Sequence, residues 1–423
     1  MLPAMASRIP LVCRSKAPAL PLDDRITHLN ALSIAPAGAS HHDLVARACG
    51  VLNYAALIAS DVGMPALAAD LCWRQHQVFA AAGRLTGDVA VMSLMPLINV
   101  SRLLTREGDG EAAYNVLARL YRAAQKRGAA EIHGRTVDLW ALTDTDANHR
   151  KVCQELWVTV LVDGARALAR IGRWTEAADI MAKHRGIGRR LLDGRQLQIM
   201  ALMERGLDQQ ARDTIDTTVP TEPWEHAIAA LLRLHCRPAV SPAPQQELDL
   251  ALQGAAALIA TPDPSTAAFQ TRAGLTALDL AHDRTSPHTP PLQDAVANVA
   301  ILDAYSARDV LNHSVTRPHL TSTQMQKLGA VLTASGLGTG QLSTTHMQTL
   351  TEAVDKAEVD LRGLLRPSRR QSVRPTLRQA ITTHLRRTPA AYESSASEGP
   401  APPNGLPHDD SRLRSTHDRH PGA

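Results

Sequence analysis

The stretch ALARIGRWTEAADIMAKH, residues 167–184, decides the fold because it repeats one pattern on both sides of Gly172. Apolar side chains recur every three or four residues before the glycine and again after it, which predicts two α-helices. Glycine supplies the backbone angles that end a helix. Ala177 then stands where the two helices cross, and its small side chain permits a close approach. The stretch therefore predicts a helical hairpin.

The same pattern occurs at three other glycines, Gly63, Gly108 and Gly206. In all four stretches an alanine follows the glycine by five residues, and an apolar or small residue follows it by nine. The alanines are Ala68, Ala113, Ala177 and Ala211. Gly172 and Gly206 are 34 residues apart, which is the period of the tetratricopeptide repeat.

In this pattern the chain resembles tetratricopeptide-repeat (TPR) proteins. Gly172, Trp174, Ala177 and Met181 match the turn glycine of that family, the aromatic residue after it, and its small and large positions. The match is partial, since Leu161 stands where the family favours Trp and the other glycine turns are unevenly spaced. The resemblance implies stacked helical hairpins, an α-solenoid, with a concave face that binds a peptide. The alternative is an irregular all-helical domain in which the glycine pattern recurs by chance.

The expected fold is therefore all-α, with disordered arms at both ends. The expected organisation is a disordered arm over residues 1–40, TPR-like helical repeats over 41–220 with an insertion near 127–150, further helical hairpins over 221–366, and a basic segment with a disordered tail over 367–423. Within the insertion a short helix is expected around Leu139. No stretch alternates apolar and polar residues for long, so almost no β-strand is expected.

Composition limits the class of protein. Hydrophobic residues make up 44% of the 423 residues, which is enough for a buried core, whereas aromatic residues make up 3%. The net charge of +4 is too small to indicate a polyanionic partner by itself. Five dispersed cysteines without a C-x-x-C pair indicate reduced thiols in a cytosol. Because no run approaches the roughly 20 apolar residues of a membrane span, a cytoplasmic protein is expected.

Four arginines occupy equivalent helix positions in two of the predicted hairpins. Arg102 and Arg106 lie one turn apart before one glycine turn, as Arg166 and Arg170 do before the next, so each pair shares one helix face. Asn53 precedes them along the same wall. Guanidinium groups along a groove bind carboxylates, so these five residues form the predicted peptide-binding site for a protein or peptide with acidic groups. Arginine also serves as an ordinary solvated residue, and that interpretation stays open.

A second candidate is the basic run of residues 362–387, which contains eight arginines and no acidic residue. Such a run could bind nucleic-acid phosphates, or it could simply solvate a helix end. The candidate residues are Arg366, Arg369, Arg370, Arg374 and Arg378. The helical stretches that flank residues 335–341 could also form a DNA-reading helix-turn-helix, although the turn is long for that motif.

The sequence contains none of the common catalytic motifs. It has no H-E-x-x-H, no G-x-S-x-G and no phosphate-binding glycine loop. Residues 144–155 carry acidic residues and an asparagine at the spacing of a calcium loop, but His149 stands where that loop needs glycine. We therefore expect no metal, no cofactor and no enzymatic activity.

Together these observations predict a cytoplasmic scaffold that binds a protein or peptide and has a role in regulation or assembly. The alternative is a transcription-related regulator that senses a peptide and contacts DNA through a basic element. Regulators of that kind usually carry a helix-turn-helix before the repeats, and residues 1–42 are too short and too rich in proline for one. An enzyme would require ionisable groups that converge in a pocket.

Overall fold

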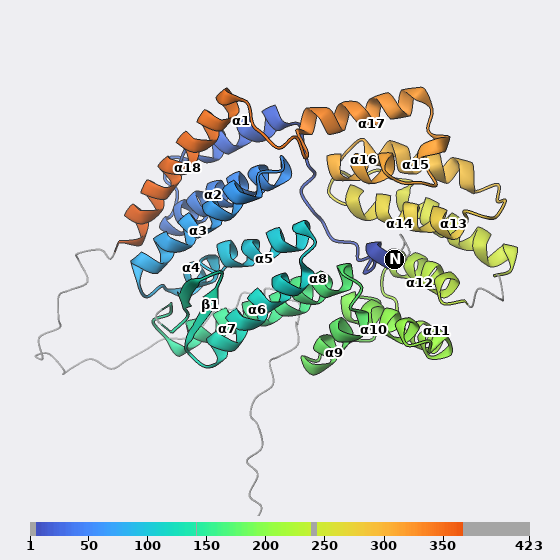
Figure 1. Cartoon of the computed structure of the whole chain (residues 1–423), viewed down its shortest axis with the longest axis horizontal. Helices are drawn as coiled ribbons and strands as arrows, with labels where there is room; N and C mark the ends of the chain where they lie inside the picture. The colour runs from blue at the N-terminus through green and yellow to red at the C-terminus, as the bar shows by residue number, and fades with distance from the viewer. Residues whose placement is uncertain (1–5, 141, 238–242, 367–423) are drawn as a thin grey trace, which may run out of the picture. The chain divides into compact units, whose positions relative to one another are not determined.

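The computed structural model describes residues 6–140, 142–237 and 243–366, and these residues are predominantly α-helical (Figure 1). The predicted all-α class is therefore confirmed. The first helices are α1 (Leu22–Leu32), α2 (His41–Asp61), α3 (Pro65–Ala82), α4 (Gly87–Met92), α5 (Met95–Glu107), α6 (Gly110–Gln125), α7 (Asp146–Thr159), α8 (Ala165–Arg170) and α9 (Trp174–Lys183). A π-helical turn, η2 (Val160–Gly164), joins α7 to α8.

The later helices continue the array of packed neighbours. They are α10 (Asp193–Glu204), α11 (Asp208–Asp216), α12 (Pro223–His235), α13 (Gln245–Ile259), α14 (Ala267–Leu280), α15 (Thr289–Ala300), α16 (Ala304–Leu311), α17 (Ser322–Ser335) and α18 (Thr344–Leu365). Two short 3-10 helices are η1 (Ala6–Arg8) and η3 (Arg317–His319). From α12 to α17, each helix contacts the next along the chain. The basic segment and tail predicted over residues 367–423 lie outside the described residues.

Four helix pairs are joined by the predicted glycine turns: α2–α3, α5–α6, α8–α9 and α10–α11. Gly63, Gly108, Gly172 and Gly206 adopt left-handed backbone angles, with φ between 71° and 88°. In each turn the N–H after the glycine donates to the carbonyl five residues earlier, over 2.8 to 3.0 Å. This Schellman arrangement satisfies the last carbonyl groups of the first helix. The helical hairpins predicted at these glycines are thus confirmed.

The alanine five residues after each glycine is completely buried. These alanines are Ala68, Ala113, Ala177 and Ala211. Their small side chains let neighbouring helices approach closely, because no bulk separates the two backbones. The approach of α6 to α8 is closer still, since a Cβ atom at Gly110 would lie 2.1 Å from the carbonyl oxygen of Ala167.

The insertion contains a β-hairpin, so the short helix expected around Leu139 is wrong. Strands β1 (Ala129–Ile132) and β2 (Arg135–Asp138) pair antiparallel across a two-residue turn. The turn residues His133 and Gly134 have φ values of 48° and 72°, and positive φ at both positions matches the twist of paired strands. Alternate side chains of β1, and Leu139 after β2, are buried. The segment therefore follows a period of two, which a helix cannot satisfy.

The disordered arm expected over residues 1–40 is wrong for residues 6–40. Residues 6–21, called the arm here, bury the side chains of Ile9, Leu11 and Val12. Figure 1 shows the arm (dark blue) passing between the helices of the two halves of the chain before it reaches α1. Prolines exclude a long helix from this segment but are compatible with an extended chain. Buried apolar side chains and the contacts described below therefore order the segment.

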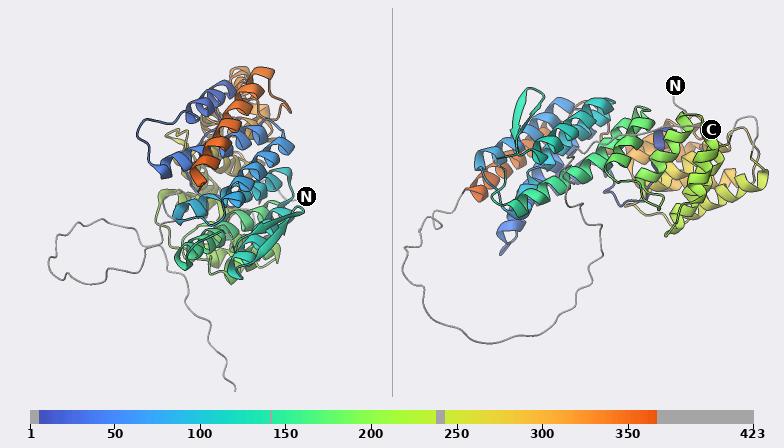
Figure 2. Two further views of the ribbon diagram at one scale, coloured as in Figure 1. Left: turned by 90° about the vertical axis from the view of Figure 1, so that its left-hand side faces the viewer. Right: turned by 90° about the horizontal axis from the view of Figure 1, so that it is seen from below.

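The last described helix packs against the first ones. α18 contacts α1, α2 and α3, while α17 contacts α1, α15 and α16. Figure 2 shows α18 (orange) beside the blue helices of the start of the chain. Leu350, Val354 and Leu361 of α18 are buried and belong to the shared hydrophobic core. Segments roughly 300 residues apart in sequence therefore form one packed group.

Two described segments are long and apolar enough to cross a membrane, by length and composition only. They are His41–Asp61, with half of its apolar window buried in the structure, and Gly87–Glu107, with 44% buried. The first segment is α2, which packs against α3 and α18. Core helices pass the same test, and the packing of α2 accounts for its apolar side chains.

Candidate functional site

The structure brings two of the predicted peptide-binding residues together through a chain of hydrogen bonds. The side-chain oxygen of Asn53 accepts from the amide of Asn99 over 3.2 Å. Asn99 in turn accepts from Nη1 of Arg102 over 3.3 Å, and Nε of Arg102 donates to Asp163 over 3.0 Å. Asn99 thus connects Asn53 to Arg102, and Asp163 already neutralises the charge of Arg102.

Arg106 belongs to a buried network around Asp61, the last residue of α2. The carboxylate of Asp61 accepts from Nη1 of Arg106 and from Nη2 of Arg25, each over 2.6 Å. The phenol of Tyr305 also donates to Asp61. Burial and the negative charge of Asp61 raise the pKa of Tyr305, so the phenol stays a neutral donor. The network joins α1, α2 and α5 to α16.

Arg166 is paired with Asp193, the first residue of α10. The same carboxylate accepts from Arg14 of the arm, and only 4% of the Asp193 side chain is exposed. Nη2 of Arg166 is buried without a hydrogen-bond partner among the described residues. Asp193 therefore links the predicted groove residue to the arm.

Arg170 differs from the other three predicted arginines. Its side chain makes no hydrogen bond or ion pair with a described residue. Burial is the largest cause that lowers the pKa of Arg170, and the positive charges of Arg272 and Arg308 lower it further, against the opposing charge of Asp309. The residue is nevertheless exposed to water. Because water screens its charge and an arginine stays protonated in proteins, the guanidinium of Arg170 is charged.

The arm is held through hydrogen bonds to its backbone. Gln196 of α10 accepts from the N–H of Leu11 and donates to the carbonyl of Leu11, each over 2.7 Å. The same amide donates to the carbonyl of Leu191 over 2.9 Å, and Gln196 is completely buried. An amide that satisfies both backbone groups of one residue recognises an extended chain irrespective of its side chains.

Carboxylates hold the arm on both sides of this contact. Arg8 donates to Asp279 of α14 over 2.5 Å, and the N–H of Ala19 donates to Asp303 over 2.8 Å. Burial by itself would raise the pKa of Asp279, but hydrogen bonds from His313 and Arg8 outweigh the burial and lower the pKa. The helix residues that make these contacts are called the arm-binding strip: Asp193, Gln196, Asp279 and Asp303.

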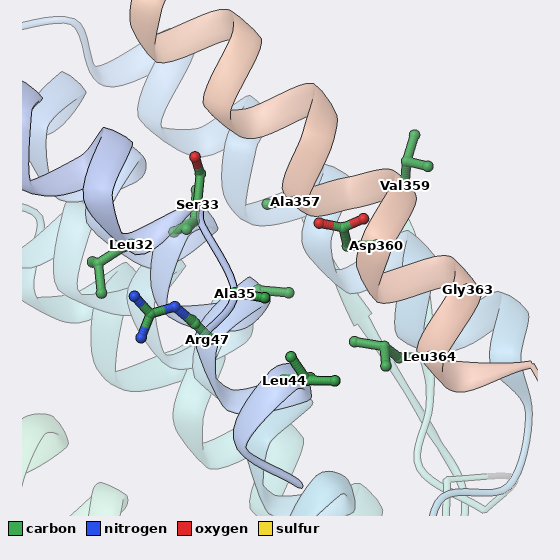
Figure 3. Close-up of a pocket in the computed structure, with 12 residues that line it drawn as sticks. Leu32, Ser33, Ala35, Leu44, Arg47, Ala357, Val359, Asp360, Gly363 and Leu364 are labelled. Carbon is green, nitrogen blue, oxygen red and sulfur yellow. The ribbon is translucent and has the colours of Figure 1, made fainter. Parts of the chain in front are cut away.

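An apolar cavity of about 500 Å³ lies where the loop between α1 and α2 meets α18 (Figure 3). Leu32, Leu44 and Leu364 contribute to its lining, and Arg47 and Asp360 are the charged residues of that lining. Arg47 already donates to the backbone carbonyls of Ala31 in α1 and Ile34 in the loop. The cavity therefore offers apolar surface but no convergent set of ionisable groups for acid-base chemistry.

Residues 144–155 begin a helix in the structure. Thr145 caps α7 by accepting from a backbone N–H, and Asp146 pairs with Arg127 over 2.6 Å. Among the residues that the structure describes, no three His, Cys, Asp or Glu side chains lie together as metal ligands would. The carboxylate of Asp146 thus forms an ion pair with Arg127 at the start of α7.

The predicted nucleic-acid-binding residues lie almost entirely outside the described chain. Arg366 is its last residue, and the others are beyond it: Arg369, Arg370, Arg374 and Arg378. The two helices considered for a helix-turn-helix are α17 and α18. Because the apolar face of α18 packs against α1, α2 and α3, that face belongs to the core.

Sequence reasoning missed the arm-binding strip and the cluster around Arg170. The strip residues lie 179 to 284 positions from the arm residues that they bind, so no local pattern marks them. One sign was available in the arm itself. Residues 1–22 contain three cationic side chains and no acidic one, so their burial requires acidic partners from elsewhere in the chain.

Comparisons of the chain with known protein families, with curated proteins and with solved structures find no match.

Proposed function

We propose that this chain is a non-catalytic scaffold that binds a protein partner through an extended peptide segment, with a role in regulation or assembly. The observation that carries the proposal is the pair of hydrogen bonds between Gln196 and the backbone of Leu11. Peptide receptors use main-chain hydrogen bonds for affinity and side-chain contacts for specificity. The arm-binding strip binds the arm through both kinds of contact, so the arm occupies the proposed peptide site.

The charge of the strip defines the segment that fits it. Asp193 and Asp279 accept from Arg14 and Arg8, which are six residues apart. A partner segment with two cationic residues at that spacing, and an apolar residue such as Leu11 between them, satisfies the same carboxylates. This cationic segment differs from the acidic partner that the sequence predicted for the four arginines. Three of those arginines already pair with carboxylates of this chain.

We also propose that the glycine-turn hairpins form a TPR-like array, an α-solenoid, in a cytoplasmic protein. The four turns with the same backbone hydrogen bonds support this proposal. The buried alanine at the same position after each turn supports it as well. Stacked hairpins of this kind present an extended inner surface on which a peptide can lie.

A competition experiment on the full chain tests the peptide-binding function. The probe is a labelled peptide of residues 6–20, and fluorescence anisotropy measures its affinity. In the wild type the tethered arm competes at an effective concentration on the order of millimolar, so the probe binds weakly. Replacing Arg8 and Arg14 of the chain by alanine weakens only the arm, because the strip is unchanged. The probe should then bind at least about tenfold more tightly.

A second change makes the test specific for the strip. Adding Gln196→Ala to the R8A/R14A chain should abolish the gain, whereas Gln209→Ala, at an exposed glutamine of α11, should leave it. Circular dichroism establishes that each variant is folded. Equal affinity of the wild type and the R8A/R14A chain, or a gain that survives Gln196→Ala, would contradict the proposal. The R8A/R14A chain is then the bait with which to identify the natural partner.

A further inference from the structure

Three arginines from three different helices have guanidinium groups that make no hydrogen bond to the described part of the chain. They are Arg170 of α8, Arg272 of α14 and Arg308 of α16, called the arginine cluster here. Asp309 lies within 4 Å of both Arg272 and Arg308, and the charges of these three residues act on Arg170. None of the three guanidiniums donates a hydrogen bond to a described residue, and each carries five N–H donors in a planar fork. The side chains of Arg272 and Arg308 are 42% and 46% exposed. Their donors are therefore open to a ligand from solution.

The carboxylates near the cluster do not satisfy it. Asp309 lies 3.7 Å from Nε of Arg272 and 3.9 Å from Nη2 of Arg308, and both distances are too long for hydrogen bonds. Asp61 is engaged by arginines of α1 and α5. Asp303 accepts from two backbone N–H groups and a serine hydroxyl. Positive charge thus exceeds negative charge at this place.

The arm adds a further cation beside the cluster. Nζ of Lys16 lies 4.1 Å from the ring centre of Tyr305, and the guanidinium carbon of Arg308 lies 5.5 Å from the same centre. Both are cation–π distances. Burial lowers the pKa of Lys16, Asp303 offsets part of that effect, and the charge of Arg272 adds to it. The cluster and Lys16 therefore repel one another, and an anion between them would relieve the repulsion.

We propose that Arg170, Arg272 and Arg308 bind the phosphate group of a phosphorylated ligand. Guanidinium groups donate pairs of parallel hydrogen bonds to phosphate oxygens. The cluster sets three positive charges against the one negative charge of Asp309. A phosphate monoester carries a charge of about −1.5 to −2 at pH 7, which matches this excess better than a carboxylate does. The site shares no residue with the arm-binding strip, although Lys16 of the arm lies beside it, and this proposal goes beyond the peptide-binding function.

Two sources offer the same chemistry: a phosphoserine or phosphothreonine of a protein, and a small phosphorylated compound. Isothermal titration of the full chain with two probes separates them. The probes are inorganic phosphate and the blocked peptide Gly-Ala-phosphoserine-Ala-Gly, with the unphosphorylated peptide as control. Both phosphate-bearing probes should bind saturably, and the control should not. Tighter binding of the phosphopeptide indicates a protein source, and equal affinity indicates a small compound.

Substitutions then assign the binding to the cluster. Arg170→Ala combined with Arg272→Ala should lower the affinity for both probes at least about tenfold. The matched control is Arg233→Ala with Arg237→Ala, because these two arginines hold ion pairs elsewhere, and it should leave the affinity unchanged. Asp309→Asn removes the competing carboxylate and should tighten binding several-fold. Binding should weaken below a pH of about 6, where phosphate loses one negative charge.

Three results would overturn the proposal. The first is the absence of saturable binding of inorganic phosphate and of the phosphopeptide up to about 10 mM, which corresponds to a very weak affinity. The second is equal affinity of the wild type and the R170A/R272A chain. The third is an Asp309→Asn chain that binds no more tightly than the wild type. The peptide of residues 6–20 reports on other residues, so failure here and failure of the peptide-binding function are distinguishable.

Discussion

Residues 41–216 and residues 223–365 are both built of helical hairpins, but their turns differ. In the first region four glycines with left-handed angles end the first helix of each pair. In the second region α12 to α16 end without such a glycine, and α17 ends at one, Gly336, with a φ of 65°. There Asp303 caps the start of α16 by accepting from the N–H of Ser306. The turns of the first region therefore follow one local glycine pattern, whereas most helices of the second region end without it.

The arm adds contacts between distant segments to the second region. It donates to Asp279 and Asp303 of the second region, and the N–H of Lys16 donates to the carbonyl of Ser265. A segment from the start of the chain thus supplies hydrogen bonds and apolar side chains to helices that lie more than 240 residues later. The glycine turns of the first region thus follow a local pattern, whereas contacts with the arm join distant segments to both regions.

The largest expected effect concerns the contact between the two regions. Asp61→Ala leaves the guanidinium of Arg25 buried without its partner, so the free energy of unfolding should fall by about 3–5 kcal/mol. Tyr305→Phe removes only the hydrogen bond from the second region and should cost about 1 kcal/mol. Urea denaturation measures both values. Equal losses in the two variants would mean that the Arg25–Asp61 pair does not dominate the network.

A smaller effect is expected on the pH dependence of stability, from a histidine of the second region. Burial lowers the pKa of His235, in the last turn of α12, to about 4, while an unfolded histidine titrates near 6.5. Between these values the unfolded chain binds a proton that the folded chain excludes, so stability falls as the pH falls. From pH 7 to pH 5, His235→Gln should lose less stability than the wild type, by on the order of 1 to 2 kcal/mol.

The control for that measurement lies on the same helix. His226 of α12 is exposed, so His226→Gln should lose as much stability as the wild type over the same pH range. Unfolding in urea at each pH gives the comparison. The same pH dependence in the His235→Gln chain and the wild type would show that His235 is not the group responsible.

The smallest effect tests the turn glycines directly. Gly206 has a φ of 71°, and a Cβ atom there would meet no atom within 4 Å. Gly206→Ala therefore adds only backbone strain and should lower the free energy of unfolding by about 1–2 kcal/mol. Gly329 lies inside α17 with the same open space, and Gly329→Ala should raise that free energy by about 0.5–1 kcal/mol. Thermal unfolding measures both, and changes of the same sign would refute the role of the left-handed angle.

The fold could be predicted from the sequence where the structure depends on neighbouring residues. Gly172 and Ala177 lie within one hairpin, so their spacing was sufficient to place the turn and the close helix crossing. The β-hairpin was missed because its strands are only four residues long, too short for a period of two to stand out. The arm was missed because the residue that orders its backbone, Gln196, lies 185 positions from Leu11.

The candidate site shows the same limit. Arg102 and Arg166 pair with Asp163 and Asp193, which only the packing of different helices brings close. Helix periodicity places a side chain on a face and says nothing about which carboxylate will meet it. For that reason Arg170, the one predicted arginine without a partner among described residues, could not be distinguished from the others beforehand.

The position of α18 has a consequence for how the protein is made. This helix covers α2 and α3, yet it leaves the ribosome roughly 300 residues after them. At translation rates of about 5–20 residues per second, α18 is synthesised roughly 15 to 60 s after α2 and α3. During that interval the apolar side chains that will meet Val354 and Leu361 are open to other nascent chains. Chaperone supply and elongation speed should therefore govern the yield of this protein in the cell.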